Sequence, residues 1–233
     1  MKKIVICVIT IVCMFIAGCG MYVHDYSHNT DDSATKSTTS VIVKKTSFGY
    51  FFDGPGNKDA LIFYPGGKVE DLAYSSLLKE IAENGMDCFL VNMPFNLAVL
   101  SPNKAQNVLD AYSYEHWYIG GHSLGGSMAA SFAYKNSDSL DGLILLAAYS
   151  TKDLRDTNLK VLTIYGSNDG VLNLDRLKEY ESNLPKDNEM YVIDGGNHSG
   201  FGTYGKQSKD GKRTISSTKQ KQLTTDKIKE FEE

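Results

Sequence analysis

Short apolar segments alternate with longer amphipathic ones from residue 41 to the end of the chain. The continuous apolar runs, expected to form strands buried on both faces, are residues 60–64, 86–93, 117–120, 143–147, 161–165 and 190–193. Helical spacing, caps and the small residues after Ser123 predict helices at 72–84, after 101, after 123, at 172–184 and at 217–233. Repeated strand–helix units indicate an α/β fold, with a mostly parallel central sheet covered by helices on both faces. Residues 41–43 and 48–52 predict an antiparallel hairpin whose turn is residues 44–47.

The N-terminal residues follow a different pattern. Two lysines precede the apolar stretch Ile4–Ala17, which is too short to span a bilayer comfortably and predicts a signal peptide over residues 1–18. Ile16-Ala17-Gly18-Cys19 resembles the lipobox of bacterial lipoproteins, which implies cleavage before Cys19 and its acylation. An ordinary signal peptide and an uncleaved anchor are the alternatives. The predicted localisation is the extracytoplasmic face of the cell membrane.

Residues 19–40 are rich in Ser, Thr and Asp and contain few apolar residues, so they predict a flexible tether before a single folded domain at 41–233. The formal net charge of the chain is −4, which gives no electrostatic case for nucleic acid as a partner. Among the 4 cysteines, only Cys88 lies in the predicted domain, where its apolar surroundings indicate a small buried hydrophobe.

The main chemical motif follows the strand predicted at 117–120. Gly121-His122-Ser123-Leu124-Gly125 fits the G-x-S-x-G pattern of a nucleophile elbow, in which a sharp turn between a strand and a helix exposes a Ser hydroxyl. The small residues around Ser123 permit the strained backbone and the close approach of neighbouring segments. The pattern alone is short and occurs by chance, but here a strand and a helix flank it as the mechanism needs. Ser123 is therefore the candidate nucleophile.

A Ser nucleophile needs a base, and the chain contains 5 histidines. Four of them are excluded as the base by their position in the chain: His24, His28, His116 and His122. The first two lie in the tether, the third precedes the nucleophile strand, and the fourth lies in the elbow with its side chain expected to point away from Ser123. His198, which follows the last predicted strand, remains as the candidate base.

The base needs an acid to orient it. Asp169 lies just beyond the strand at 161–165, at the edge where catalytic groups of open α/β sheets collect. A solvated turn residue is the alternative interpretation of Asp169. The less favoured carboxylates, which lie at a strand start, in loops or too close to His198, are Asp141, Asp153, Asp156 and Asp194.

An acyl-transfer intermediate also needs backbone N–H donors for its oxyanion. Leu124, the residue after the nucleophile, is one expected donor. The other is expected from the loop after the strand at 60–64, which reads Pro65-Gly66-Gly67-Lys68. Pro65 has no N–H, so Gly67 is the first choice and Lys68 the second. A simple Pro-Gly-Gly turn is the alternative.

These motifs follow one another in the order found in a known family of proteins. The segments Phe63–Gly67, Met93–Ala98, Gly121–Gly126, Tyr165–Asp169 and Gly195–Gly205, within about 170 residues from Ala60 onward, resemble the α/β-hydrolase superfamily. The chain closely resembles the small, lid-poor bacterial branch of that superfamily, which is related to carboxylesterases and dienelactone hydrolases. The resemblance implies the α/β-hydrolase fold and a triad of Ser123, Asp169 and His198. Two departures are Pro65, where the family usually has His, and Ser123, where dienelactone hydrolases have Cys.

The sequence therefore predicts a membrane-anchored serine hydrolase that cleaves carboxylic esters, with no cofactor and no metal. Only about twelve residues separate the strands at 143–147 and 161–165, so no large cap domain is expected. Phe95 and Phe201 are the candidate side chains for binding an ester substrate, either a small molecule or a lipid-like one; the alternative is that both merely pack beneath loops. A non-catalytic lipoprotein that uses the same fold for binding is the alternative function. Family membership does not specify the substrate.

Overall fold

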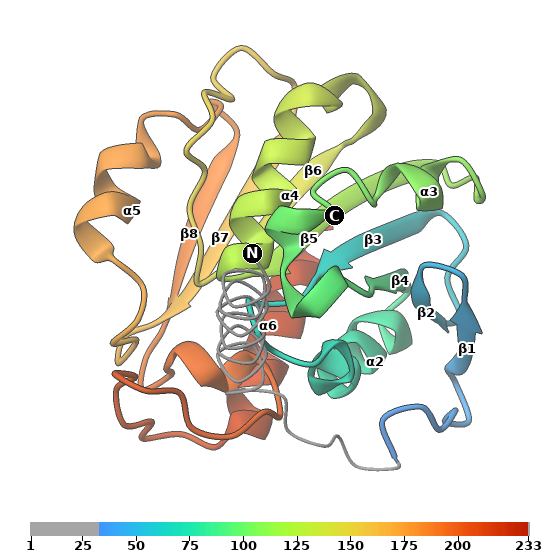
Figure 1. Cartoon of the computed structure of the whole chain (residues 1–233), viewed down its shortest axis with the longest axis horizontal. Coiled ribbons are helices and arrows are strands. Elements are labelled where there is room, and N and C mark those ends of the chain that lie inside the picture. Colours follow the sequence, from blue (N-terminus) through green and yellow to red (C-terminus); the bar gives the residue numbers. More distant parts are fainter. Residues whose placement is uncertain (1–32, 233) are drawn as a thin grey trace, which may run out of the picture.

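The computed structural model describes residues 33–232, and its centre is an eight-stranded sheet in the order β1-β2-β4-β3-β5-β6-β7-β8 (Figure 1). The strands are β1 Ile42–Thr46, β2 Gly49–Asp53, β3 Asp59–Tyr64, β4 Met86–Val91, β5 His116–His122, β6 Gly142–Leu146, β7 Lys160–Gly166 and β8 Asn188–Ile193. Strands β3 to β8 are parallel, whereas β2 pairs antiparallel with both β1 and β4. The mostly parallel α/β sheet predicted from the sequence is confirmed.

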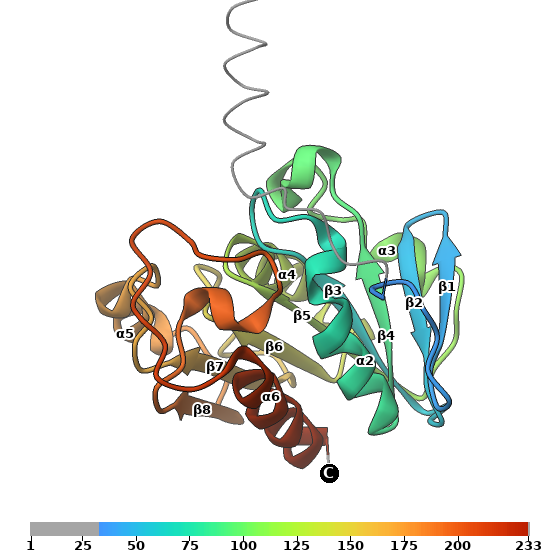
Figure 2. The same ribbon diagram turned by 90° about the horizontal axis from the view of Figure 1, so that it is seen from below.

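Helices cover both faces of this sheet. The α-helices are α2 Ser75–Glu83, α3 Gln106–Leu109, α4 Leu124–Lys135, α5 Leu174–Glu181 and α6 Ser217–Glu232. The 3-10 turns are η1 Asp71–Tyr74, η2 Pro94–Asn96, η3 Ala98–Leu100, η4 Ser137–Ser139 and η5 His198–Phe201. Helices α2 and α6 lie side by side on one face (Figure 2), and α3 and α4 pack on the other.

Strand β3 shows how the alternation of side chains builds two cores. Leu61 and Phe63 belong to the core under α2 and α6, whereas Ile62 and Tyr64 belong to the core under α3 and α4. Successive residues of a strand point to opposite faces, so a strand covered on both sides must be apolar throughout. All six residues of β4 are likewise buried.

The parallel strands end at one edge of the sheet, which we call the carboxyl edge. In open α/β sheets this edge holds the ligands and the catalytic groups. The connection between β6 and β7, residues 147–159, contains no helix or strand. No large cap domain therefore covers the carboxyl edge at this position.

Two local predictions were wrong. Lys44 and Lys45 belong to β1 rather than to the turn, because Thr46 pairs directly with Gly49 across a two-residue connection. The helix predicted to begin at Ser101-Pro102 is reduced to α3. There the buried hydroxyl of Tyr64 donates to the carbonyl of Pro102 and accepts from the N–H of Ala105, so a side chain takes over the backbone bonds of this segment.

The last part of the predicted tether is bound to the domain. Thr38 and Ser40 both donate hydrogen bonds to the carboxylate of Glu83, at the end of α2. One turn earlier on the same helix, Lys79 donates to the carbonyl of Ser33 at 2.6 Å. Residues 33–40 therefore run along α2 from the level of Lys79 to that of Glu83.

Two further predictions concern the burial of Cys88 and the N-terminal membrane anchor. Cys88 is fully buried, and this burial raises the pKa of its thiol. The predicted signal peptide and Cys19 lie outside the described residues. Within residues 33–232, no helix has the length and apolar character needed to cross a bilayer.

Candidate active site

Ser123 occupies a strained turn between β5 and α4. Its φ and ψ angles are 53° and −122°, a conformation that costs a residue with a side chain about 1–3 kcal/mol. A Cβ atom at Gly121 would lie 2.6 Å from the carbonyl oxygen of Tyr64, and one at Gly125 would lie 2.3 Å from that of Pro65. The two glycines of the motif are thus required for the β3 loop to pass this close to the elbow.

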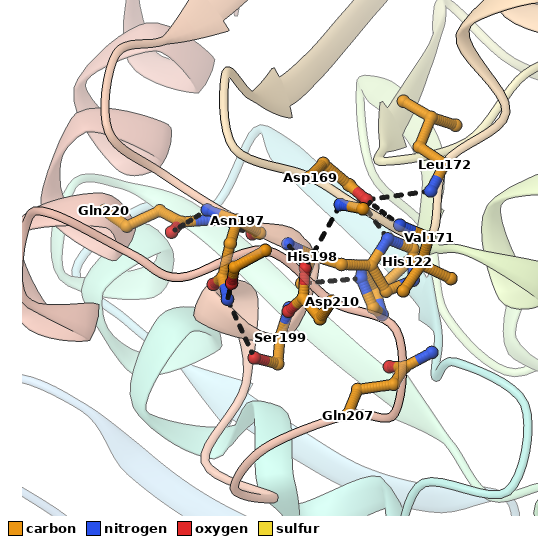
Figure 3. A network of polar contacts seen from close by, with 12 residues as sticks. His122, Asp169, Val171, Leu172, Asn197, His198, Ser199, Gln207, Asp210 and Gln220 are labelled. Atoms are coloured by element: carbon orange, nitrogen blue, oxygen red, sulfur yellow. Dashed lines mark hydrogen bonds and ion pairs between the residues drawn. The ribbon is translucent and has the colours of Figure 1, made fainter.

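His198 and Asp169 form a buried pair beside the elbow (Figure 3). The Nδ1 atom of His198 lies 2.8 Å from Oδ2 of Asp169, and the two side chains are 1% and 0% exposed. The other carboxylate oxygen accepts the N–H groups of Val171 and Leu172, both at 2.8 Å. These two bonds fix the carboxylate in the orientation in which it faces the imidazole.

The pairing determines which nitrogen of His198 is free to act as a base. A carboxylate only accepts hydrogen bonds, so in the neutral imidazole Nδ1 carries the hydrogen and Nε2 carries the lone pair. Nε2 is buried and has no hydrogen-bond partner among the described residues. An unpartnered buried polar atom costs about 1–3 kcal/mol, which indicates that a hydroxyl or a substrate binds there.

Behind this pair, His122 connects two loops of the carboxyl edge. Its Nε2 lies 3.1 Å from the carbonyl oxygen of His198, and its Nδ1 lies 2.8 Å from the hydroxyl of Tyr74. Burial, with the neighbouring His198 ring, lowers the pKa of His122 well below its usual value, so the imidazole is neutral. Because the carbonyl can only accept, Nε2 carries the hydrogen and the Tyr74 hydroxyl donates to Nδ1. That hydroxyl also accepts the N–H of Gly66 at 3.1 Å, which completes a chain from one loop to the other.

The same loop contains the candidate oxyanion donors. The N–H of Gly66 is bound to Tyr74, and the N–H of Lys68 donates to the carbonyl of Asn96 at 2.7 Å. Of the two donors that the sequence leaves open, Lys68 is therefore already engaged. A Cβ at Gly67 would meet the Leu124 side chain at 2.8 Å, so these two residues are neighbours. Their N–H groups are the pair that this geometry favours.

Asp210, which the sequence analysis missed, holds the backbone at His198. Its carboxylate accepts the N–H groups of His198 and Ser199, at 3.1 and 2.9 Å (Figure 3). Its Oδ1 also lies 3.4 Å from the N–H of Gly170, next to Asp169. Asp210 therefore bridges the loops that carry the acid and the base. It sits in a loop between β8 and α6, where the sequence offers no signal beyond a turn-forming Asp-Gly pair.

The two phenylalanines singled out from the sequence lie in contrasting environments. Phe201 is fully buried, with its ring 5.6 Å from the ring of His122. Phe95 is 73% exposed, on the loop after β4. In this structure Phe201 supports the loop that carries His198, and direct contact of either residue with a substrate stays a prediction. Within residues 33–232, no cluster of three His, Cys, Asp or Glu side chains is arranged to hold a metal ion.

Comparison with known proteins places the chain in a family. A model of the alpha/beta hydrolase family matches residues 60–222, so this protein belongs to that family. No curated protein matches it in sequence.

Solved structures agree with this assignment at the level of the fold. A predicted CIB-like hydrolase from Thermoplasma acidophilum is 14% identical, with a TM-score of 0.58 over 82% of this chain and 99% of that one. Est1E from Butyrivibrio proteoclasticus is 14% identical, with a TM-score of 0.59 over 83% and 97% of the two chains. Carboxyl esterase 2 from Tuber melanosporum is 11% identical, with a TM-score of 0.63 over 92% and 97%.

Proposed function

We propose that this protein is a serine hydrolase that cleaves carboxylic esters through an acyl-enzyme. The observation that carries the proposal is the buried His198–Asp169 pair, whose unpartnered Nε2 lies at the same sheet edge as the strained Ser123. One of the similar solved structures is described as a carboxyl esterase, which supports esters as the substrate class.

In this mechanism His198 acts first as a base and then as an acid. Nε2 takes the proton of Ser123 while Oγ attacks the ester carbonyl carbon, and the N–H groups of Gly67 and Leu124 bind the developing oxyanion. The intermediate expels the alcohol, which receives the proton from His198. Water then repeats the sequence on the acyl-enzyme and releases the acid. Asp169 keeps its hydrogen bond to Nδ1 and so holds the imidazole in the reactive tautomer.

The substrate class that we propose is esters with short acyl groups, because no large cap encloses the carboxyl edge. We further propose that cleavage before Cys19 and its acylation hold the protein on the outer face of the cell membrane. Two or more acyl chains are needed for stable anchoring. Mass spectrometry of the mature N-terminus tests this part, and an unmodified N-terminus at another residue would exclude it.

A fluorophosphonate probe tests the nucleophile. Wild-type protein should be labelled at Ser123, and Ser123→Ala should abolish labelling while lowering kcat on p-nitrophenyl butyrate by a factor on the order of 10⁴. Ser127→Ala, one turn further along α4, is the matched control and should behave as wild type. Absence of labelling and of hydrolysis across acetyl to long-chain esters, in a folded protein, would favour the non-catalytic alternative.

A further inference from the structure

The loop between β4 and α3 exposes a cluster of large apolar side chains. Phe95 is 73%, Leu100 56% and Val99 51% exposed, and we call residues 94–100 the apolar loop. Single exposed apolar residues are common on protein surfaces, whereas contiguous ones mark contact surfaces. The remaining exposed large apolar residues are scattered over β1, α4, α5 and β8.

The apolar loop is held in a defined conformation. Phe95 and Asn96 have φ angles of 52° and 56°, a left-handed conformation that is uncommon for residues with side chains. Asn96 is fixed from both sides, because its carbonyl accepts the N–H of Lys68 at 2.7 Å and its N–H donates to Met93 at 3.0 Å. Strained conformations persist where the surrounding structure enforces them, often at binding surfaces. Phe95 is thus displayed on a supported loop.

The apolar loop also lies beside the candidate active site. Lys68, which binds Asn96, directly follows the proposed oxyanion donor Gly67. The η3 turn of the apolar loop packs against α4, the helix that begins after Ser123. In Figure 2 the loop after β4 lies on the same side of the molecule as the loop after β3. A surface bound by the apolar loop would therefore face the carboxyl edge.

Charge favours a lipid surface as the occupant. Residues 93–109 contain no Asp or Glu, and their one charged side chain is the cation Lys104. Because this segment carries no carboxylate, its contact with anionic headgroups would bury no negative charge and cause no repulsion from its own side chains. Phe and aliphatic side chains are the residues that bury an apolar face at the boundary of headgroups and acyl chains.

The first described residue, Ser33, lies nearer to the carboxyl edge than Thr38 does. Because α2 starts at the carboxyl edge and runs away from it, Lys79 is nearer to that edge than Glu83. Ser33, bound to Lys79, therefore lies closer to the edge than Thr38, bound to Glu83. Ser33 is the first residue that the structure describes, and residues 19–32 link it to Cys19. Residues 19–32, when extended, reach roughly 45–50 Å.

We propose that the apolar loop inserts into the lipid bilayer to which Cys19 is anchored, so that the active site faces esters presented in the membrane. The inference rests on the proposed anchor, which supplies a high local concentration of lipid to a surface too small to bind tightly alone. It names membrane-presented esters with short acyl groups as a substrate class of the same site.

Tryptophan quenching in the full chain tests the insertion. Phe95→Trp is reconstituted into phosphatidylcholine–phosphatidylglycerol vesicles whose acyl chains carry bromine, and Ile42→Trp is the matched control. Ile42 is 53% exposed and begins β1 at the opposite edge of the sheet, while the native Trp117 is 9% exposed. We expect about half of the added fluorescence of Phe95→Trp to be quenched and that of Ile42→Trp to be unchanged.

The possible outcomes each decide the proposal. Equal quenching of the two variants, no quenching in vesicle-bound protein, or failure to sediment with vesicles would overturn it. A concentration-dependent blue shift of Phe95→Trp without lipid would instead assign the loop to contact with a second copy of the chain.

Activity supplies a second test. Val99→Ser/Leu100→Ser should hydrolyse soluble p-nitrophenyl butyrate as wild type does, but an ester embedded in vesicles several-fold more slowly; equal loss on both substrates would contradict the proposal. Because quenching needs no catalysis, a failed hydrolase assignment would remain distinguishable from failed insertion.

Discussion

Asp210 holds His198 through the backbone: its carboxylate accepts the N–H of His198 at 3.1 Å and that of the next residue at 2.9 Å. Removing both acceptors would let the His198 loop shift, and a displacement of about 1 Å at a catalytic group can cost on the order of 10²-fold in rate. We expect Asp210→Ala to lower kcat by about 10- to 100-fold with a smaller change in KM.

Steady-state kinetics check this prediction against two further variants. Asp210→Asn keeps one acceptor oxygen and should recover part of the rate. Asp194→Ala, a carboxylate on the same sheet edge that binds only the exposed Ser167 hydroxyl in this structure, is the control and should stay near wild type. Equal losses for Asp210→Ala and Asp194→Ala would show that Asp210 has no special role in placing His198.

The identity of the catalytic acid can be tested with isosteric amides. Asp169→Asn leaves the geometry nearly intact but favours the wrong tautomer of His198, so kcat should fall by a factor of up to about 10⁴. Asp194→Asn should change it by less than threefold, because Asp194 is not paired with His198. The comparison is made in kcat on one soluble ester, and a larger loss for the Asp194 variant would reverse the assignment.

The oxyanion loop offers a test that separates a backbone donor from a side chain. Gly67→Pro removes the N–H, and losing one oxyanion donor costs about 10²–10³ in kcat. Gly67→Ala keeps the donor and adds a Cβ whose nearest neighbour is the flexible end of Leu124, so its loss should be far smaller. Similar kcat values for the two variants would indicate that another group binds the oxyanion.

Burial of neutral His122 makes the stability of the fold depend on pH. Its pKa is well below 6.5 in the folded protein and about 6.5 in the unfolded chain, so below pH 6.5 the unfolded state binds more protons. The contribution of His122 to the free energy of unfolding should therefore decrease by about 1.4 kcal/mol between pH 7.5 and 5.5. Urea unfolding of wild type and His122→Gln at both pH values measures it. An identical pH dependence in the two proteins would mean that His122 protonates freely in the folded state.

Much of the fold follows from local patterns that the sequence displays. The apolar runs of β3, β6 and β7 are short and nearly continuous, as expected of strands covered on both faces, and the elbow motif marks where β5 ends and α4 begins. The candidate triad could be predicted from the sequence for the same reason, since each member comes soon after a recognisable strand.

Tyr74 and Asp210 could not be found in this way. Each acts through a contact with a different loop or element: Tyr74 meets His122 across 48 residues, and Asp210 meets the backbone 11 and 12 residues before it. A buried Tyr in a helical stretch and an Asp in a polar loop look like ordinary core and turn residues. Likewise the helix expected after Ser101 depends on the hydroxyl of Tyr64, 38 residues before the carbonyl that it binds.

Because Cys88 is buried, folding of the domain should not depend on the redox state of its surroundings. It is the only cysteine within residues 33–232, and its thiol is fully enclosed with a raised pKa, so little of the reactive thiolate is present. Folding of this part of the chain involves no cross-link to be made, shuffled or lost. The native state should therefore form equally well with or without reductant, on either side of a membrane.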